Sequence, residues 1–148
     1  MTILFARLMV MPRKDAFHEI VKTALVKDGW TITHDPLILK FGEQDVFVDL
    51  GAEAPLAAEK AGRKIAVEVK SFLGKSGITE LERAIGQYIL YRSLLRRGET
   101  ERGLFLALPV EAYNAVLDSV SGEELISAEA IKLVLFDVAE EAIRQWIE

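Results

Sequence analysis

The sequence lacks cysteine and is poor in histidine, and both shortages restrict the chemistry open to the protein. None of its 148 residues is cysteine, and its two histidines are His18 and His34. Disulfide bonds, zinc–thiolate sites, iron–sulfur clusters and cysteine nucleophiles are therefore excluded. A zinc site would have to be completed with carboxylates, so the composition favours an oxygen-ligated metal, Mg²⁺ or Mn²⁺.

Long hydrophobic runs and an excess of positive charge are also missing. Apolar residues make up 51% of the chain, but no run approaches the roughly 20 residues that a membrane-spanning helix needs. The apolar start MTILFARLMV has neither a charge in front of it nor a small-residue cleavage site behind it. We therefore expect a cytoplasmic protein without a signal peptide or a membrane partner. The net charge of −5 opposes unassisted binding to nucleic acid, although a local basic patch or a basic partner is compatible with it.

The length of the chain fits one domain with its own hydrophobic core. We expect residues 11–148 to form this domain, because the sequence contains no internal repeat, linker or low-complexity segment. Two interpretations are open for residues 1–10. They form either an extension upstream of a native start at Met11 or a strand that docks on the domain.

The hydrophobic pattern predicts a mixed α/β architecture with one sheet. Apolar residues at helical spacing predict helices over residues 14–28 and 77–97, and a third helix over 110–120. Residues 140–147 fit a helix and a strand equally well. Short apolar runs bounded by turn residues predict strands over 30–34, 37–41, 46–50, 56–59, 65–72, 104–108 and 132–136, with 60–64 as a hairpin turn. The order of these segments indicates helices packed on a mixed sheet.

The most informative segment is the strand predicted over residues 65–72. Alternate side chains share a face in a strand, so Glu68 and Lys70 point the same way, with Ala66 beside them. Burying either charge alone would be costly, and mutual pairing, a metal ion or solvent in a cleft must offset that cost. The competing interpretation is an ordinary ion pair at the surface of the sheet.

Other carboxylates are candidates to join Glu68. Asp49 lies at the end of the apolar run 46–50, and a hairpin would bring it to Glu68 so that both bind one hard cation. Glu59 is the alternative second ligand because it lies nearer to Glu68 along the hairpin. Asp49 is otherwise explained as a turn residue that caps the backbone before Gly51. Glu19, beside the apolar stripe of the first helix, is a weaker candidate.

The helix predicted over residues 77–97 carries a second group of candidates. Gln87 and Tyr91 lie four residues apart and therefore share a face. Basic residues near the end of this helix offer a ledge for a DNA backbone, or else form a solvated terminus that the helix dipole favours. These residues are Arg92, Arg96, Arg97 and Arg102.

Taken together, these residues resemble the PD-(D/E)XK nuclease superfamily. Its pattern is a helix, an acidic residue on a strand, Glu-x-Lys on the paired strand, and then a helix with further strands. The resemblance implies a restriction-endonuclease-like mixed β-sheet flanked by helices. It also implies that Asp49 and Glu68 bind Mg²⁺ or Mn²⁺, that Lys70 positions the attacking water, and that Glu19 is an accessory ligand or base. The sequence departs from the pattern at Val48, where the superfamily often has proline.

The pair Gln87-x-x-x-Tyr91 resembles a motif of the RecB-like branch of that superfamily. This resemblance implies that Gln87 supports the active site or contacts DNA, with Tyr91 packed behind it.

Longer strings of sequence are similar to the XisH family. They cover residues 12–22, 28–36, 49–53, 57–60, 65–72 and 86–91, so that the likeness extends over nearly all of 11–148. It supports Met11 as the native start. It also implies that residues 142–147 pair as a strand with 132–136. XisH proteins are associated in cyanobacteria with controlled excision of the fdxN DNA element, alongside a recombinase and a small partner, XisI.

Three functional hypotheses follow. The first is a metal-dependent, endonuclease-like factor for the controlled excision of a DNA element. The second is a non-catalytic accessory protein that binds DNA, XisI or the recombinase. The third is a regulatory module that forms a pair with XisI. The expected partners are therefore DNA, an XisI-like protein and a site-specific recombinase, and a homodimer is compatible with the sequence.

Overall fold

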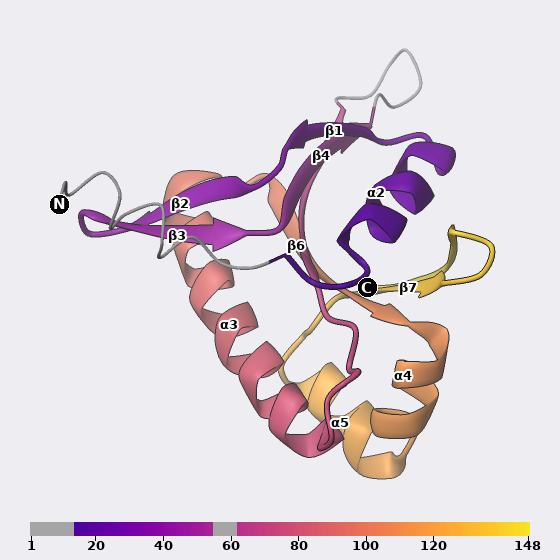
Figure 1. Ribbon diagram of the computed structural model, residues 1–148. Coiled ribbons are helices and arrows are strands. Elements are labelled where there is room, and N and C mark those ends of the chain that lie inside the picture. The colour runs from indigo at the N-terminus through magenta and orange to yellow at the C-terminus, as the bar shows by residue number, and fades with distance from the viewer. Residues whose placement is uncertain (1–13, 55–61) are drawn as a thin grey trace, which may run out of the picture.

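A computed structural model describes residues 14–54 and 62–148 and shows helices packed on both faces of a mixed sheet (Figure 1). Its elements in chain order are α2 (His18–Lys27), β1 (Thr31–His34), β2 (Leu37–Phe41), β3 (Gln44–Val48), β4 (Leu50–Ala54), β5 (Arg63–Val69), α3 (Gly77–Gly98), β6 (Arg102–Pro109), α4 (Val110–Val116), α5 (Val120–Ala128), β7 (Leu133–Asp137) and β8 (Ala142–Ile147). The expected N-terminal extension, the strand expected over 56–59 and the candidate ligand Glu59 lie outside the described residues. The α/β class expected from the sequence is confirmed.

The main sheet has six strands in the order β1-β4-β5-β6-β7-β8. The central pairs β5-β6 and β6-β7 are parallel, and the outer pairs are antiparallel. Strands β2 and β3 form a separate antiparallel hairpin beside α3 (Figure 1). The sheet is therefore mixed, with parallel strands at its centre and antiparallel strands toward both edges.

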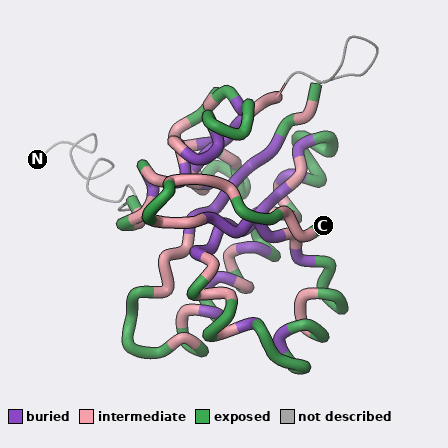
Figure 2. The backbone as a smooth tube through the Cα atoms, turned by 90° about the vertical axis from the view of Figure 1, so that its right-hand side faces the viewer, coloured by how far each residue is buried: buried purple, intermediate pink, exposed green. Residues whose placement is uncertain are grey.

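Both faces of the central strands are buried, which explains why β5 and β6 are almost continuously apolar. Ala66 lies in a core with α3, α4 and α5, whereas Val67 and Val69 lie in a second core with α2. Figure 2 shows the buried segments running through the middle of the molecule and the exposed ones around them. Because Glu68 alternates with Val67 and Val69, its side chain enters the layer between the sheet and α3.

The strand predicted over residues 46–50 is wrong in its bounds. The chain bends at Asp49, so that β3 ends at Val48 and β4 begins at Leu50. Gly51 does not end a strand but lies inside β4, where a Cβ would come within 3.0 Å of the imidazole of His34. Glycine in this strand therefore leaves room for a neighbouring side chain. As a result, β4 pairs with β5 from Leu50 opposite Val67 to Ala54 opposite Arg63.

Two helices differ from their predicted bounds. The first begins at His18 rather than at 14, because the Asp15 carboxylate accepts a hydrogen bond from the Phe17 amide and forms a turn before the helix. The helix predicted over 110–120 is two helices, α4 and α5, and the sequence did not indicate the second. A Cβ at position 122 would come within 2.1 Å of the Leu117 carbonyl oxygen, so Gly122 allows the close turn between them.

The C-terminal segment is the antiparallel edge strand β8, as the family resemblance implies. Its Trp146 ring lies 5.0 Å from that of Phe105 and 5.7 Å from that of Trp30, measured between centroids. These aromatic contacts secure the strand to the α2 face of the sheet. Within residues 14–54 and 62–148, no helix combines the length and hydrophobicity needed to cross a membrane.

Candidate functional site

The bend between β3 and β4 brings Asp49 against the end of β5. The Asp49 amide donates a hydrogen bond of 3.2 Å to Glu68 Oε1. In return, the Val69 amide donates one of 2.8 Å to Asp49 Oδ2. These reciprocal bonds hold the two carboxylates side by side, although they come from positions 19 residues apart.

Burial changes the ionisation of this carboxylate pair. Glu68 is only 6% exposed. Desolvation, together with the negative charge of Asp49, raises its pKa to about 8 against the opposing effect of Lys70. Desolvation also raises the pKa of Asp49. The two carboxylates carry like charges and lie close together where there is little water. The pair therefore retains a proton near neutral pH unless a cation binds to it.

Lys70 borders the pair on its more solvated side. Its Nζ lies 3.5 Å from Glu68 Oε2, and its side chain is 23% exposed. The Lys70 amide donates to the Ala107 carbonyl oxygen, which continues the hydrogen bonding of β5 to β6 beyond Val69. The structure thus brings Asp49, Glu68 and Lys70 together. One ammonium group does not balance the two carboxylates when both are ionised.

Tyr91 and Gln87 lie on α3, which packs on the face of the sheet that Glu68 enters. Tyr91 is buried, and its pKa is raised first by desolvation and then by the charges of Glu68 and Asp49. Its phenol therefore stays protonated beside the carboxylates. The Oε1 atom of Gln87 is buried without a hydrogen-bond partner among the described residues. A buried acceptor of this kind is suited to an ordered water or a ligand donor.

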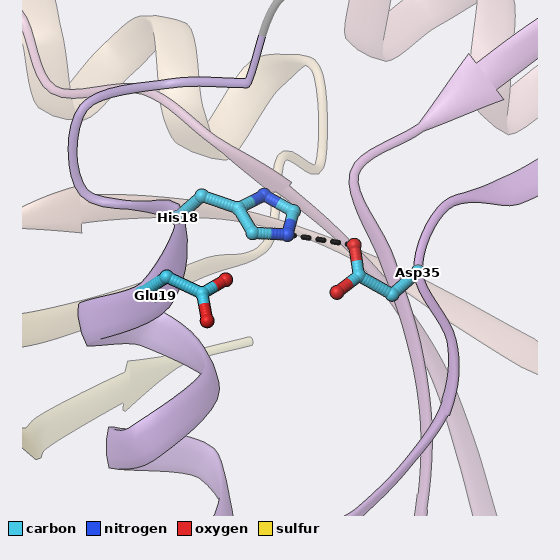
Figure 3. Close-up of side chains that lie close together, drawn as sticks. All are labelled: His18, Glu19 and Asp35. Atoms are coloured by element: carbon cyan, nitrogen blue, oxygen red, sulfur yellow. Dashed lines mark hydrogen bonds and ion pairs between the residues drawn. The ribbon is translucent and has the colours of Figure 1, made fainter.

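Glu19 lies in a different acidic group, with His18 and Asp35 (Figure 3). One potential ligand atom from each of these residues lies within 4.8 Å of the others. Lys22 Nζ is 2.7 Å from Asp35 Oδ2 and 3.8 Å from Glu19 Oε2. The ammonium group of Lys22 thus already compensates part of the negative charge of Asp35 and Glu19.

The hydrogen bonds that Asp35 accepts favour its ionised form. Burial alone would raise the pKa of Asp35, but the hydrogen bonds from Lys22 and His18 outweigh that effect and lower it. Lys14 Nζ adds a longer contact of 3.9 Å to the same carboxylate. Asp35 therefore has its compensating cations within the protein, and its group is a completed ion-pair network.

His18 belongs to the site but was not among the candidates chosen from the sequence. It is 3% exposed, and its Nε2 lies 2.7 Å from Asp35 Oδ1. Its Nδ1 is buried without a partner among the described residues. The charge of His18 lowers the pKa of Asp49, which places the imidazole within electrostatic reach of both acidic groups. The scarcity of histidine, with His18 on the buried face of a helix, is the signal that could have indicated it.

The four arginines of the candidate basic ledge lie in different surroundings. Arg102 is 5% exposed, donates to the Ile65 carbonyl oxygen at 2.9 Å and forms an ion pair with Glu99. It is therefore an internal residue, and its inclusion in a DNA-facing ledge is wrong. Arg92 Nη1 donates to the carbonyl oxygens at the end of α5, whereas Arg96 and Arg97 are exposed on the last turn of α3.

Comparison with known proteins decides the family. A family model described as XisH protein matches residues 11–144. The chain belongs to the XisH family. A crystal structure of an XisH family protein from Nostoc punctiforme PCC 73102 superposes with a TM-score of 0.81 at 43% identity, covering 90% of this chain and 100% of that one. A search of curated proteins finds no match.

A second crystal structure is that of an fdxN element excision controlling factor protein from Anabaena variabilis. It is 44% identical, with a TM-score of 0.81, and the match covers 91% of this XisH chain and 100% of that chain. At this identity and coverage, the two chains share their whole architecture.

Proposed function

We propose that this XisH protein is a metal-dependent, endonuclease-like factor that acts on DNA during the controlled excision of a DNA element. The buried pair of Asp49 and Glu68 beside Lys70 is the observation that carries the proposal. The role in excision follows the description of the Anabaena variabilis relative. The activity follows from the chemistry of these three side chains.

The order of the elements supports a PD-(D/E)XK scaffold. An acidic residue precedes β4, the Glu-x-Lys triplet extends from the antiparallel neighbour β5, and α3 follows with Gln87 and Tyr91. A shared scaffold does not determine an activity, so the proposed reaction rests on the side chains.

The donor set fits a hard divalent cation. Mg²⁺ is commonly held by one or two carboxylates, with water and substrate phosphate completing its shell. Asp49 and Glu68 would hold Mg²⁺ or Mn²⁺. The pKa of both groups is raised, so the cationic groups of the protein do not fully compensate the charge of the two carboxylates. His18 favours the ionised form of Asp49, which is the form that binds a cation.

The side chains around the carboxylates have separate tasks. A bound Mg²⁺ or Mn²⁺ would supply Lewis acidity toward the scissile phosphate and toward a water molecule. Lys70 would orient that water and offset the negative charge that develops on the phosphorus oxygens. Tyr91 would keep bulk water away from the carboxylates from behind, and Gln87 would use its free Oε1 to hold a water or a DNA group.

A nicking assay tests the proposed function. Supercoiled plasmid is incubated with the full chain and Mg²⁺ or Mn²⁺, with and without an XisI-like protein. We expect nicking that chelation abolishes and that Glu68→Gln reduces about 100-fold or more, because the substitution removes a ligand charge. Glu124→Gln, an exposed change on α5, is the matched control. Wild-type protein that neither binds Mn²⁺ nor nicks DNA, even with its partner, would refute the proposal.

A non-catalytic accessory role is the second candidate, and the net charge of −5 favours it. An acidic protein binds DNA more readily through a partner than alone. This role predicts a stable complex with an XisI-like protein, a recombinase or DNA that survives Glu68→Gln unchanged. Loss of that complex in the variant would count against it.

A further inference from the structure

A basic cavity lies at the other end of the parallel strands from Glu68. Its volume is about 300 Å³, and it lies between the last turns of α3 and the beginnings of β6 and β7. Arg92 and Arg96 supply guanidinium groups to its wall, whereas Lys132 lines it with its ammonium group 5.8 Å from the Phe105 ring centroid, toward the α2 face of the sheet. Cavities from about 300 Å³ upward are large enough to hold a small ligand group.

One of the two acidic residues at the cavity is already compensated. Glu99 forms an ion pair with the buried Arg102. Among the residues that line the cavity, four are cationic and two are acidic, so the wall carries a formal charge of +2 in a chain whose net charge is −5. Neither Arg96 nor Lys132 forms an ion pair within the described part of the chain. Glu101 is the one acidic residue here that opposes an anion without a cationic partner.

The guanidinium of Arg92 is held in place before any ligand arrives. Arg92 Nη1 lies 2.6 Å from the Glu129 carbonyl oxygen, and its guanidinium lies 5.3 Å from the Tyr88 ring centroid. The Tyr88 hydroxyl donates to the Leu104 carbonyl oxygen and accepts from the Lys132 amide, which fixes the start of β7 beside α3. A positioned guanidinium loses little conformational entropy when it binds an oxyanion.

The geometry points to a phosphate-binding site in this cavity, formed by Arg92 and Arg96. Its ligand is a phosphate group, for which arginine and lysine provide charge-assisted hydrogen bonds. Two sources of that group are a DNA backbone and a free nucleotide or inorganic phosphate. The site goes beyond the proposed function, because it binds phosphate without cutting it and does not use Asp49 or Glu68.

One DNA duplex is long enough to reach the cavity and the carboxylates together. Arg102, at the start of β6, pairs with Lys64, which precedes Glu68 by four residues on β5. At about 3.3 Å per residue, the two places are about 13 Å apart along the strand. That length corresponds to about four base-pair steps of a duplex. A backbone phosphate in the cavity would therefore help to set the register of DNA along the sheet.

The test measures binding in chelator, so that no metal-dependent reaction contributes. The full chain is titrated into a short fluorescein-labelled duplex over about 50 to about 200 mM salt, and separately with inorganic phosphate by calorimetry. The variants are Arg92→Gln and Arg96→Gln. Arg83→Gln is the matched control, since Arg83 is exposed on α3 but does not line the cavity. Thermal melting monitored by circular dichroism checks that each variant folds.

A DNA ligand predicts that each cavity variant weakens duplex binding about tenfold and reduces the salt slope by about 1. Arg83→Gln should leave both unchanged, and Glu101→Gln should strengthen binding. A free ligand predicts instead that inorganic phosphate binds, that the cavity variants abolish this binding, and that duplex binding does not respond. Both outcomes support a phosphate site and identify its source. If Arg83→Gln weakens binding as much as Arg96→Gln, or if no cavity variant changes either titration, the site is overturned.

Failure of this site and failure of the proposed function give different results. If nicking depends on Glu68 but DNA binding does not change in Arg96→Gln, the phosphate site is refuted and the proposed function is supported. If phosphate binding depends on Arg96 but the protein never nicks DNA, the proposed function is refuted and the phosphate site is supported.

Discussion

Two acidic groups of this XisH protein have carboxyl pKa values that are shifted in opposite directions. Asp35 and Glu19 share Lys22, and the pKa of Asp35 is lowered by its hydrogen-bond partners despite burial. Asp49 and Glu68 are more deeply buried, and their pKa values are raised. The first group is electrostatically complete, while the second leaves charge that only a proton or an added cation compensates. The ionisation of clustered carboxylates therefore depends on the cations that the protein itself supplies to them.

Replacing Lys70 separates chemistry from metal binding at the uncompensated pair. Lys70→Met removes the ammonium group 3.5 Å from Glu68, so we expect nicking to fall about 100-fold or more while Mn²⁺ still binds. Plasmid nicking and Mn²⁺ calorimetry measure the two effects. Lys75→Met, in the exposed loop before α3, is the control. Equal losses in the two lysine variants would show that Lys70 acts only through general charge.

Replacing Asp35 tests whether the other group is structural. Asp35→Asn weakens the charge-assisted bonds from Lys22 and His18, so we expect the free energy of unfolding to fall by about 2 kcal/mol. Urea denaturation measures the loss, with the exposed change Asp118→Asn as a control. Mn²⁺ binding at Asp49 and Glu68 should persist in the folded variant. A stable Asp35→Asn protein that has lost its Mn²⁺ affinity would reverse the two assignments.

The opposite pKa shifts predict opposite responses to pH. Glu68 has a pKa of about 8 in the folded protein, against 4.5 ordinarily, so the folded state binds its proton more tightly between these values. The contribution of Glu68 to stability is therefore greatest at low pH and is lost as pH rises through about 8, by about 1 kcal/mol or more. Urea midpoints in chelator between about pH 5 and about pH 9 should fall, and Glu68→Gln should flatten that fall. An equally steep fall of the urea midpoint with pH in Glu68→Gln would show that Glu68 does not cause the pH dependence.

Asp35 responds in the other direction. Because its folded-state pKa lies below the ordinary value of 3.8, its stabilisation is present above that value and is lost as pH falls through the lowered pKa. Acid unfolding of wild type and Asp35→Asn should therefore converge at low pH. Curves that stay equally far apart at every pH would show that ionisation of Asp35 contributes nothing.

The smallest expected effect comes from removing the cation that completes the Asp35 group. Lys22→Met should raise the pKa of Asp35 and lower stability by about 1 kcal/mol, because the ammonium group at 2.7 Å is lost. It should also give His18, Glu19 and Asp35 a weak new affinity for Mn²⁺, seen as paramagnetic broadening of the His18 ring signals. Lys27→Met, at the end of α2, is the control. Broadening that is already present in wild type would contradict the account.

The sequence predicts the regular elements well where local patterns determine them. The strand at 37–41 and the helix at 77–97 match β2 and α3 closely, because turn residues and helical periodicity define their ends. Period-two alternation also predicts that Ala66 and Val67 enter different cores. The bend at Asp49 was missed because it depends on bonds to Glu68 and Val69 across the sheet. Local sequence does not encode such a partner.

The candidate site was predicted only in part for the same reason. Glu68 and Lys70 are adjacent in the pattern, and their shared face follows from strand geometry. The bond between His18 and Asp35 joins residues 17 positions apart, so no spacing rule indicates it. Glu19 was grouped with Glu68 by analogy, whereas its ion pair in the structure is with Lys22.

Locating Mn²⁺ in the protein tests the contrast between the two acidic groups most directly. A crystal soaked in Mn²⁺ and measured at the manganese absorption edge shows the ion as an anomalous difference peak. The account predicts a peak at the carboxylates of Asp49 and Glu68 and none among His18, Glu19 and Asp35. A peak at the Asp35 group, or no peak at Asp49 and Glu68, would contradict it.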